Sequence, residues 1–208
     1  MDPDARREAI IDATVSVMLH KGMAATTVRD VSQRMGTSSG LVHHYFASMD
    51  GLLAAAFDHA ATQDLEATTV AMASCGEPVQ RLAAFFWTYA RAEQGWTFQL
   101  WLDAWSEAVR RPEVQETSRR LNVAWQQLLV ETIHDGVRRR VMSCPDPEAA
   151  AWRILSLLDG LVLQTVAHRV PIERDVVIAW SVAHAENELG LPAGSIRSVS
   201  ATSTDEPA

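Results

Sequence analysis

The chain has 208 residues, of which 48% are hydrophobic and 21% are charged, and its formal net charge at pH 7 is −8. This length suits two domains better than one, and the apolar fraction excludes a disordered chain. No stretch approaches the roughly 18 uninterrupted apolar residues that a membrane helix requires. The acidic balance gives no sign of nucleic-acid binding, although only the surface that meets phosphate has to be basic.

The amino-terminal residues are acidic and then basic, without the apolar core of a signal peptide, so we expect a cytoplasmic location. Cys75 and Cys144 lie far apart and match no metal-binding or redox spacing. They are expected to be reduced and structural.

Apolar residues recur at helical spacing along the chain, and no run alternates as a strand does. A first helix is expected from about residue 3 to residue 20, where Gly22 ends it. Thr26 or Thr27 then caps a short second helix. The buried stripe of this helix consists of Val28, Val31 and Met35.

Gly36 forms the next turn, followed by a third helix from about residue 38 to residue 46 and a fourth from about residue 49 to residue 73. The remaining helices are expected at about 78–94, 96–110, 112–140, 147–168 and 172–189. Asp146 caps the eighth helix, with Pro147 as its first residue. The tail from residue 192 to residue 208 is expected to be disordered. The predicted fold class is all-α, with about nine helices.

Two short helices joined by a glycine turn can be a DNA-reading unit or merely a compact corner of the fold. Val42 and Phe46, four residues apart, can pack inward against the second helix. The outward face of the third helix then carries two histidines, a tyrosine and small hydroxyl groups, which suit hydrogen bonds to base edges and phosphates. This pattern favours a helix-turn-helix over residues 27–46.

The segment TTVRDVSQRMGTSSGLVHHYFASMDGLLAAAF, residues 26–57, resembles the DNA-binding domain of the TetR family. The shared features are the threonine-capped helix, Gly-x-Ser-x-Gly, the His-Tyr-Phe ending and Ser-x-acid-x-Leu opening the fourth helix. The likeness covers about residues 4–64. It implies a homodimer whose recognition helices enter successive major grooves of double-stranded operator DNA. The domains expected are 1–48 for DNA binding and 49–191 for ligand binding and dimerisation.

The resemblance implies that Thr27 caps its helix against a phosphate and that the third helix carries further contacts, while Arg29 on the second helix is one of the few cations left to meet DNA. The DNA-binding residues assigned in this way are Thr27, Arg29, Ser38, Ser39, Gly40, Leu41, His43, His44 and Tyr45. The chain departs from the family at Ser39 and Met49, where lysine is common. With five Lys/Arg against six Asp/Glu in residues 1–50, the reading head is nearly neutral. Arg29, Arg34 and Lys21 remain as cations, so a shallow salt dependence is expected.

Aromatic residues are concentrated in the carboxyl-terminal part, which in this family binds a small molecule. Aromatic walls often line ligand cavities, although core packing is the favoured interpretation for most of these residues taken singly. The residues assigned to the ligand are Trp87, Phe98, Trp101, Trp105, Trp125 and Asp159. Asp159 interrupts an apolar stripe and therefore needs either a cationic ligand or an internal arginine. Asp103 and Glu107 face away from the aromatic stripe and are excluded as its counter-charge.

The later segments WLDAWSEAVRRPE and LLDGLVLQTV are similar to the BetI-like subgroup, whose best-known role is choline-responsive control of betaine synthesis. This resemblance implies a repressor released by a small cationic, aromatic or apolar effector. The last two helices carry wide apolar faces that would form a four-helix bundle with a second copy. The residues assigned to this dimer interface are Leu157, Leu161, Val176, Val177 and Trp180.

The sequence gives little support for enzyme activity. His184 and Glu188 share a helix face but have no third metal ligand nearby, so neither a metal nor a cofactor is expected. His134 and Asp135 are adjacent, so their side chains diverge and form no dyad. The main alternative is a helical ligand-binding protein whose DNA-binding head has degenerated, since the family lysines are missing.

Overall fold

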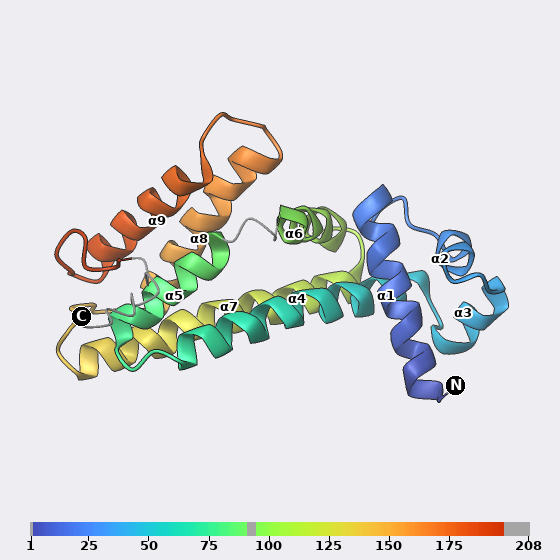
Figure 1. Cartoon of the computed structure of the whole chain (residues 1–208), viewed down its shortest axis with the longest axis horizontal. Helices are drawn as coiled ribbons and strands as arrows, with labels where there is room; N and C mark the ends of the chain where they lie inside the picture. The colour runs from blue at the N-terminus through green and yellow to red at the C-terminus, as the bar shows by residue number, and fades with distance from the viewer. Residues whose placement is uncertain (1, 91–94, 198–208) are drawn as a thin grey trace, which may run out of the picture. The chain divides into compact units, whose positions relative to one another are not determined.

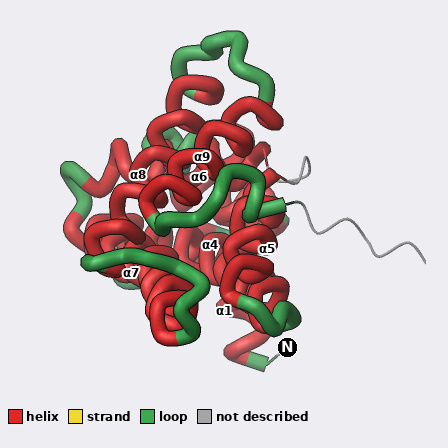
Figure 2. Tube along the Cα trace, turned by 90° about the vertical axis from the view of Figure 1, so that its left-hand side faces the viewer, coloured by secondary structure: helices red, strands yellow, loops and turns green. Residues whose placement is uncertain are grey.

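The computed structural model describes residues 2–90 and 95–197, apart from the side chains of residues 89, 90, 95 and 96. Over these residues the chain is helical with intervening loops and contains no strand (Figure 2). The all-α fold class is confirmed. The helices are α1 Pro3–Lys21, α2 Val28–Met35, α3 Ser39–Tyr45, α4 Met49–Ala73, α5 Pro78–Ala90, α6 Gly95–Ala108, α7 Pro112–Arg138, α8 Pro147–Val166 and α9 Arg174–Glu188 (Figure 1).

Helix starts follow the signals in the sequence closely. The Asp146 side chain accepts a 3.0 Å hydrogen bond from the backbone N–H of Ala149, and Pro147 is the first residue of α8. Proline fits this position because the first turn of a helix has no internal partner for its N–H groups. The last residues of the expected helix 78–94 lie outside the described residues.

The chain divides into two compact units, each built from two separate stretches. The first unit combines Met1–Asp64 with Glu93–Val123, and the second combines Leu65–Ala92 with Ala124–Ala208. This division differs from the expected boundary after residue 48, because α6 packs against α1 and the start of α7 belongs to the same compact unit as the first half of α4. The functional boundary at residue 48 stays a prediction.

In the first unit, α1 packs against both α2 and α6, and α2 packs against α3 (Figure 1). Its fully buried apolar side chains come from every helix of the unit. They include Ile10, Met18, Val31, Val42, Leu52, Phe57, Leu100 and Leu121. Burying such side chains removes apolar surface from water, which is the main stabilising contribution to a core of this kind.

In the second unit, α9 packs against both α8 and α5. The core includes Leu82, Phe85, Phe86, Leu129, Ile133, Ile154, Leu158 and Ile178. Val177, which the sequence assigned to the dimer interface, is only 3% exposed and belongs to this core. An amphipathic helix pattern does not distinguish the side of α9 that packs inside the unit from a side that would meet a second copy, and Val177 is buried inside the unit.

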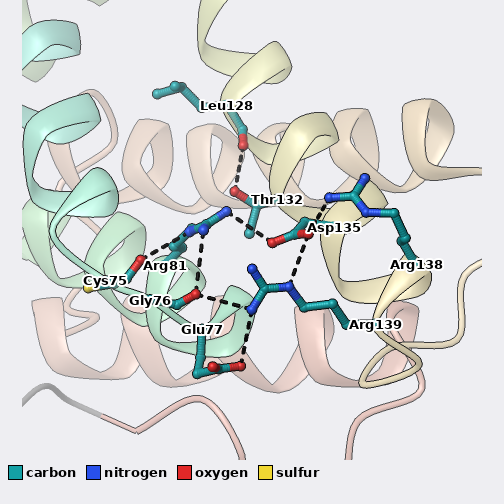
Figure 3. Close-up of polar contacts among 9 residues, drawn as sticks. All are labelled: Cys75, Gly76, Glu77, Arg81, Leu128, Thr132, Asp135, Arg138 and Arg139. Atoms are coloured by element: carbon teal, nitrogen blue, oxygen red, sulfur yellow. Dashed lines mark hydrogen bonds and ion pairs between the residues drawn. The ribbon is translucent and has the colours of Figure 1, made fainter.

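A buried carboxylate joins α7 to the turn between α4 and α5 (Figure 3). Asp135 accepts hydrogen bonds from Arg81 at 3.2 Å, from Arg139 at 3.1 Å and from Arg138. Arg81 also donates to the carbonyl oxygen of Cys75 at 3.1 Å, and Arg139 donates to that of Gly76 at 3.3 Å. The arginine side chains therefore satisfy two carbonyl groups of the turn that follows α4.

The segment after α9 differs from the expectation that the chain is disordered from residue 192. Residues 192–197 fold back along α9, and Ile196 is buried. The buried carboxylate of Glu186 accepts the backbone N–H groups of Gly194 at 2.9 Å and Ile196 at 2.8 Å. Composition does not reveal this anchor, because it depends on one acidic side chain in the preceding helix. Residues 198–208, for which disorder was also expected, lie outside the described residues.

By length and composition, α8 could cross a membrane, with a mean hydropathy of 1.3 over its most apolar 18 residues. The core helix of a soluble protein passes the same test. Ala150, Ile154 and Leu158 of α8 are completely buried in the second unit, which fits a core helix.

Candidate DNA-reading site and effector residues

Thr27 begins the reading unit by capping α2 through a reciprocal pair of hydrogen bonds. Its hydroxyl oxygen accepts the backbone N–H of Asp30 at 3.2 Å, and the Asp30 carboxylate accepts the Thr27 N–H at 3.1 Å. This capping box satisfies two N–H groups that the first turn leaves unpaired. Thr26, the other candidate cap, is buried and donates to the carbonyl of Gly22 at 2.9 Å.

The charge of Asp30 is balanced inside the protein. The Lys21 ammonium lies 2.7 Å from the Asp30 carboxylate and, with the Thr27 hydroxyl, holds the pKa of that carboxyl below its usual range. Lys21 is therefore partly neutralised as a phosphate ligand. Among the described residues, Arg29 and Arg34 are exposed and form no ion pair. They are the cations of α2 that remain available to DNA.

Gly36 turns the chain between α2 and α3. Its backbone adopts φ 66° and ψ 33°, in the left-handed region, and Thr37 N–H donates to the carbonyl of Ser32 at 2.9 Å. L-residues with a side chain pay roughly 1–2 kcal/mol for this conformation. The glycine of the Gly-x-Ser-x-Gly segment is therefore required by the turn itself.

Two side chains fix α3 on the unit. Val42 is 1% exposed and Phe46 is 7% exposed, as the four-residue spacing predicted. The Arg7 guanidinium lies over the Phe46 ring, 4.9 Å from its centroid, and holds the end of α3 against α1. These contacts determine which face of α3 is left to solvent.

The opposite face of α3 carries the residues assigned to DNA. Ser38, Gly40, His43 and His44 are exposed, as is Thr27 on α2, whereas Leu41 and Tyr45 are half-buried. The Tyr45 ring meets the His44 ring edge to face, with centroids 5.2 Å apart. Ser39 is also half-buried, and its hydroxyl oxygen lies 3.2 Å from that of Ser32 on α2. The structure thus leaves Ser38, Gly40, His43 and His44 exposed, whereas Ser39 lies toward α2.

The residues assigned to the effector are divided between the two units. In the first unit, Phe98 and Trp101 are buried, Trp105 is half-buried, and the Trp101 ring lies 4.9 Å from Phe57 and 5.7 Å from Trp105. These three residues form an aromatic side of α6. The face predicted for that helix is therefore present.

In the second unit, Trp125 packs its ring against Phe85 with centroids 6.0 Å apart, and Trp87 and Asp159 are half-buried. The indole N–H groups of Trp87 and Trp125 are buried and, within the described part of the chain, donate to no acceptor. A buried indole N–H normally donates a hydrogen bond. Each of these two indole groups can therefore donate to an acceptor atom of a bound molecule without breaking an existing hydrogen bond.

Trp180 is the most exposed residue assigned to the dimer interface, at 51%, and Trp152 on α8 is 41% exposed. Leu157, Leu161 and Val176 are half-buried. Tryptophan is enriched at protein–protein interfaces relative to the rest of the surface. The sequence did not predict the ion pairs that Arg111 forms with Asp50 and with Glu107 in the first unit.

Two family models match the chain. The model for bacterial regulatory proteins of the tetR family matches residues 10–56, and the model for the carboxyl-terminal domain of BetI-type transcriptional repressors matches residues 78–190. The chain belongs to the TetR family of transcriptional regulators. Its carboxyl-terminal part is of the BetI type. This assignment confirms the resemblance seen in the sequence and the prediction that the chain is not an enzyme.

Among curated relatives, the HTH-type transcriptional regulator BetI of Rhizobium meliloti is 31% identical over 183 residues, covering 86% of each chain. BetI of Paraburkholderia xenovorans is 33% identical over 183 residues, covering 82% of this chain and 86% of the relative. TetR-family members bind operator DNA and small-molecule effectors, and the chain spans most of the length of these relatives.

Solved structures share the fold. A TetR regulator from Haloarcula marismortui superimposes with a TM-score of 0.81 at 21% identity, covering 89% of this chain and 99% of that one. A transcriptional regulator from Saccharomonospora viridis, solved in complex with choline, superimposes with a TM-score of 0.80 at 19% identity, covering 90% and 98%. Identities this low establish the TetR fold and nothing finer.

Proposed function

We propose that this TetR-family regulator is a cytoplasmic repressor that binds a palindromic operator as a homodimer and leaves it when a small molecule binds. The observation that carries the proposal is the exposed face of α3, where His43 and His44 stand outward while Val42 and Phe46 hold the helix from behind. Imidazole groups and small hydroxyls can hydrogen-bond both base edges and phosphates.

The reading head achieves this contact with few cations. If Arg29 and Arg34 of each head meet phosphate, a dimer makes four such contacts. The logarithm of the operator association constant should then fall with the logarithm of salt concentration with a slope of about −4. Relatives that carry lysine at the positions of Ser39 and Met49 should show a steeper slope.

The effector proposed is a small organic cation. Support comes from the aromatic side of α6, since indole faces attract cations, and from the choline bound to the Saccharomonospora viridis regulator. Release requires that the effector bind one conformation more tightly than the other. The conformation that it prefers must be the one that does not fit the operator. Thermal-shift titration should show stabilisation by choline and none by its neutral isostere 3,3-dimethylbutanol at equal concentration.

The dimer proposed joins the exposed side of α8 and α9 to the same side of a second copy. Support comes from Trp152 and Trp180, which together expose indole surface on adjacent helices. An isologous contact would suit a palindrome, because twofold symmetry in the protein matches twofold symmetry in the DNA.

The DNA assignment is tested with a duplex that the wild-type protein selects from a randomised library. His43→Ala and Tyr45→Ala should each weaken binding to that duplex about tenfold or more while leaving the dimer intact, since each removes contacts worth about 1–3 kcal/mol. Gln63→Ala on α4, another exposed position in the first unit, is the matched control. Selection of no duplex even at low salt would support instead a ligand-binding protein with a degenerate head.

A further inference from the structure

Helix α6 has two different sides in the first unit. One side carries Phe98, Trp101 and Trp105, of which Trp101 contacts Phe57 on α4 at 4.9 Å. Asp103 and Glu107 lie one turn apart, and each is about 200° around the helix from the tryptophan two residues before it. The two carboxylates therefore point away from the aromatic side, and neither has a role in the DNA and effector sites described above.

Asp103 contacts the backbone just before the helix-turn-helix. One carboxylate oxygen accepts the N–H of Met23 at 3.2 Å, and the other accepts the side-chain amide of Gln99 at 3.0 Å. Met23 is completely buried, and the preceding residue, Gly22, adopts φ +82°. A Cβ on Gly22 would lie 3.4 Å from the same Asp103 oxygen. The carboxylate thus fits closely against the turn that leads into α2.

Glu107 reaches the backbone just after the helix-turn-helix through an arginine. Its buried carboxylate accepts the Nε–H of Arg111 at 2.6 Å, and the same guanidinium donates to Asp50, the second residue of α4. Beside this pair, the Ser48 hydroxyl donates to Glu113 at 3.2 Å. The hydrogen bond to Glu107, and after it the one to Asp50, raises the pKa of the Arg111 guanidinium.

We infer that Asp103 and Glu107 are positioning residues for DNA reading, which hold the helix-turn-helix at its two ends. Met23 lies four residues before Thr27, and Asp50 lies four residues after Phe46. A carboxylate–amide hydrogen bond fixes both the distance and the direction between its two groups. A shift of α6 therefore moves both ends of residues 27–46 together and leaves the contacts between α2 and α3 intact.

This inference rests on the proposed function, because it concerns the unit that is proposed to read DNA. It also gives the aromatic side of α6 a direct connection to that unit. An effector that displaces Trp101 or Trp105 displaces Asp103 as well, since all three belong to one helix. Within the first unit, the displacement therefore reaches the helix-turn-helix through α6 itself, without an intervening series of side-chain contacts.

The test compares Asp103→Asn with Asp103→Leu in the full-length protein. Asparagine keeps an oxygen that can accept the Met23 N–H, and leucine does not. Ser106→Leu adds the same apolar group at an exposed position of the same helix and serves as the control. The probe is the duplex selected by the wild-type protein, together with a scrambled duplex of equal length and composition.

Asp103→Leu should bind the selected duplex at least tenfold more weakly, while its affinity for the scrambled duplex changes less than twofold. Asp103→Asn and Ser106→Leu should stay within threefold of the wild type on both. A merely structural role would lower the affinity for both duplexes together, in step with a loss of helicity. Should Asp103→Leu not fold, Asp103→Ala takes its place with the same expectations.

If the wild type selects a duplex and Asp103→Leu binds that duplex as tightly as the wild type does, the positioning role is refuted and the proposed function stands. Failure of Asp103→Asn to restore binding refutes it as well. If the wild type selects no duplex, the proposed function fails, and the positioning role fails with it.

Discussion

Replacing Asp135 by alanine should lower the free energy of unfolding by about 3 kcal/mol. The carboxylate is 8% exposed and accepts from three guanidinium groups, of which Arg81 is 28% and Arg138 is 72% exposed. The hydrogen bond with the partly buried Arg81 contributes about 1.5–3 kcal/mol, because both partners are charged. Arg138 and Arg139 are screened by water and contribute about 0.2–1 kcal/mol each. The sum agrees with the roughly 3–5 kcal/mol lost when one partner of a buried ion pair is removed.

Urea unfolding followed by tryptophan fluorescence measures this loss, at one fixed protein concentration because a dimer couples stability to concentration. Arg138→Ala is the matched control and should cost less than about 1 kcal/mol. Asp135→Asn keeps an acceptor and should fall between the two. If Asp135→Ala unfolds within about 0.5 kcal/mol of the wild type, the carboxylate does not stabilise the junction of α7 with the α4–α5 turn, and the reasoning is refuted.

Three further predictions concern the turn at Gly36, the half-buried acid Asp64 and the dimer. Gly36→Ala should lower the free energy of unfolding in urea by about 1 kcal/mol, because no atom lies within 4 Å of the added Cβ and only the left-handed backbone conformation opposes the side chain. Gly36→Asn should lower it less, and equal losses for the two variants would contradict this explanation. Burial raises the pKa of the Asp64 carboxyl from the ordinary 3.8 to about 6. The folded protein therefore favours the neutral acid, and the stability that this provides is present at low pH and is lost as the pH rises from about 4 to 6. Asp64→Asn should therefore stabilise the protein by roughly 2 kcal/mol at pH 8 and leave it unchanged at pH 4, and a gain independent of pH would exclude this cause. Trp180→Glu should convert the dimer into monomers in sedimentation analysis while Trp180→Phe does not, and an intact Trp180→Glu dimer would place the interface elsewhere.

The features that the sequence predicted well are those decided by neighbouring residues. The α2 cap needs a hydroxyl at Thr27 and an acceptor at Asp30, three residues on, and both are visible in one turn of sequence. The inward position of Val42 and Phe46 follows from helical periodicity alone. The all-α fold and the exposed face of α3 follow from such local rules.

The features that escaped prediction join distant parts of the chain. Asp103 meets Met23 across 80 residues, and Arg111 meets Asp50 across 61, so no local pattern marks either pair. Asp103 had been recognised only as facing away from the aromatic stripe. Val177, which was assigned to the dimer interface, is buried within the second unit. An apolar position on α9 suits contact with neighbouring helices as well as contact with a second copy.

The discontinuous first unit has a consequence for building hybrid regulators. Exchanging DNA specificities between relatives by joining two sequences after residue 48 would separate Met23 from its own Asp103 and Ser48 from its own Glu113. A graft that carries residues 1–64 together with 93–123 transplants the head along with the helices that contact it. Sensor modules of this protein should therefore be exchanged as two segments of sequence, not one.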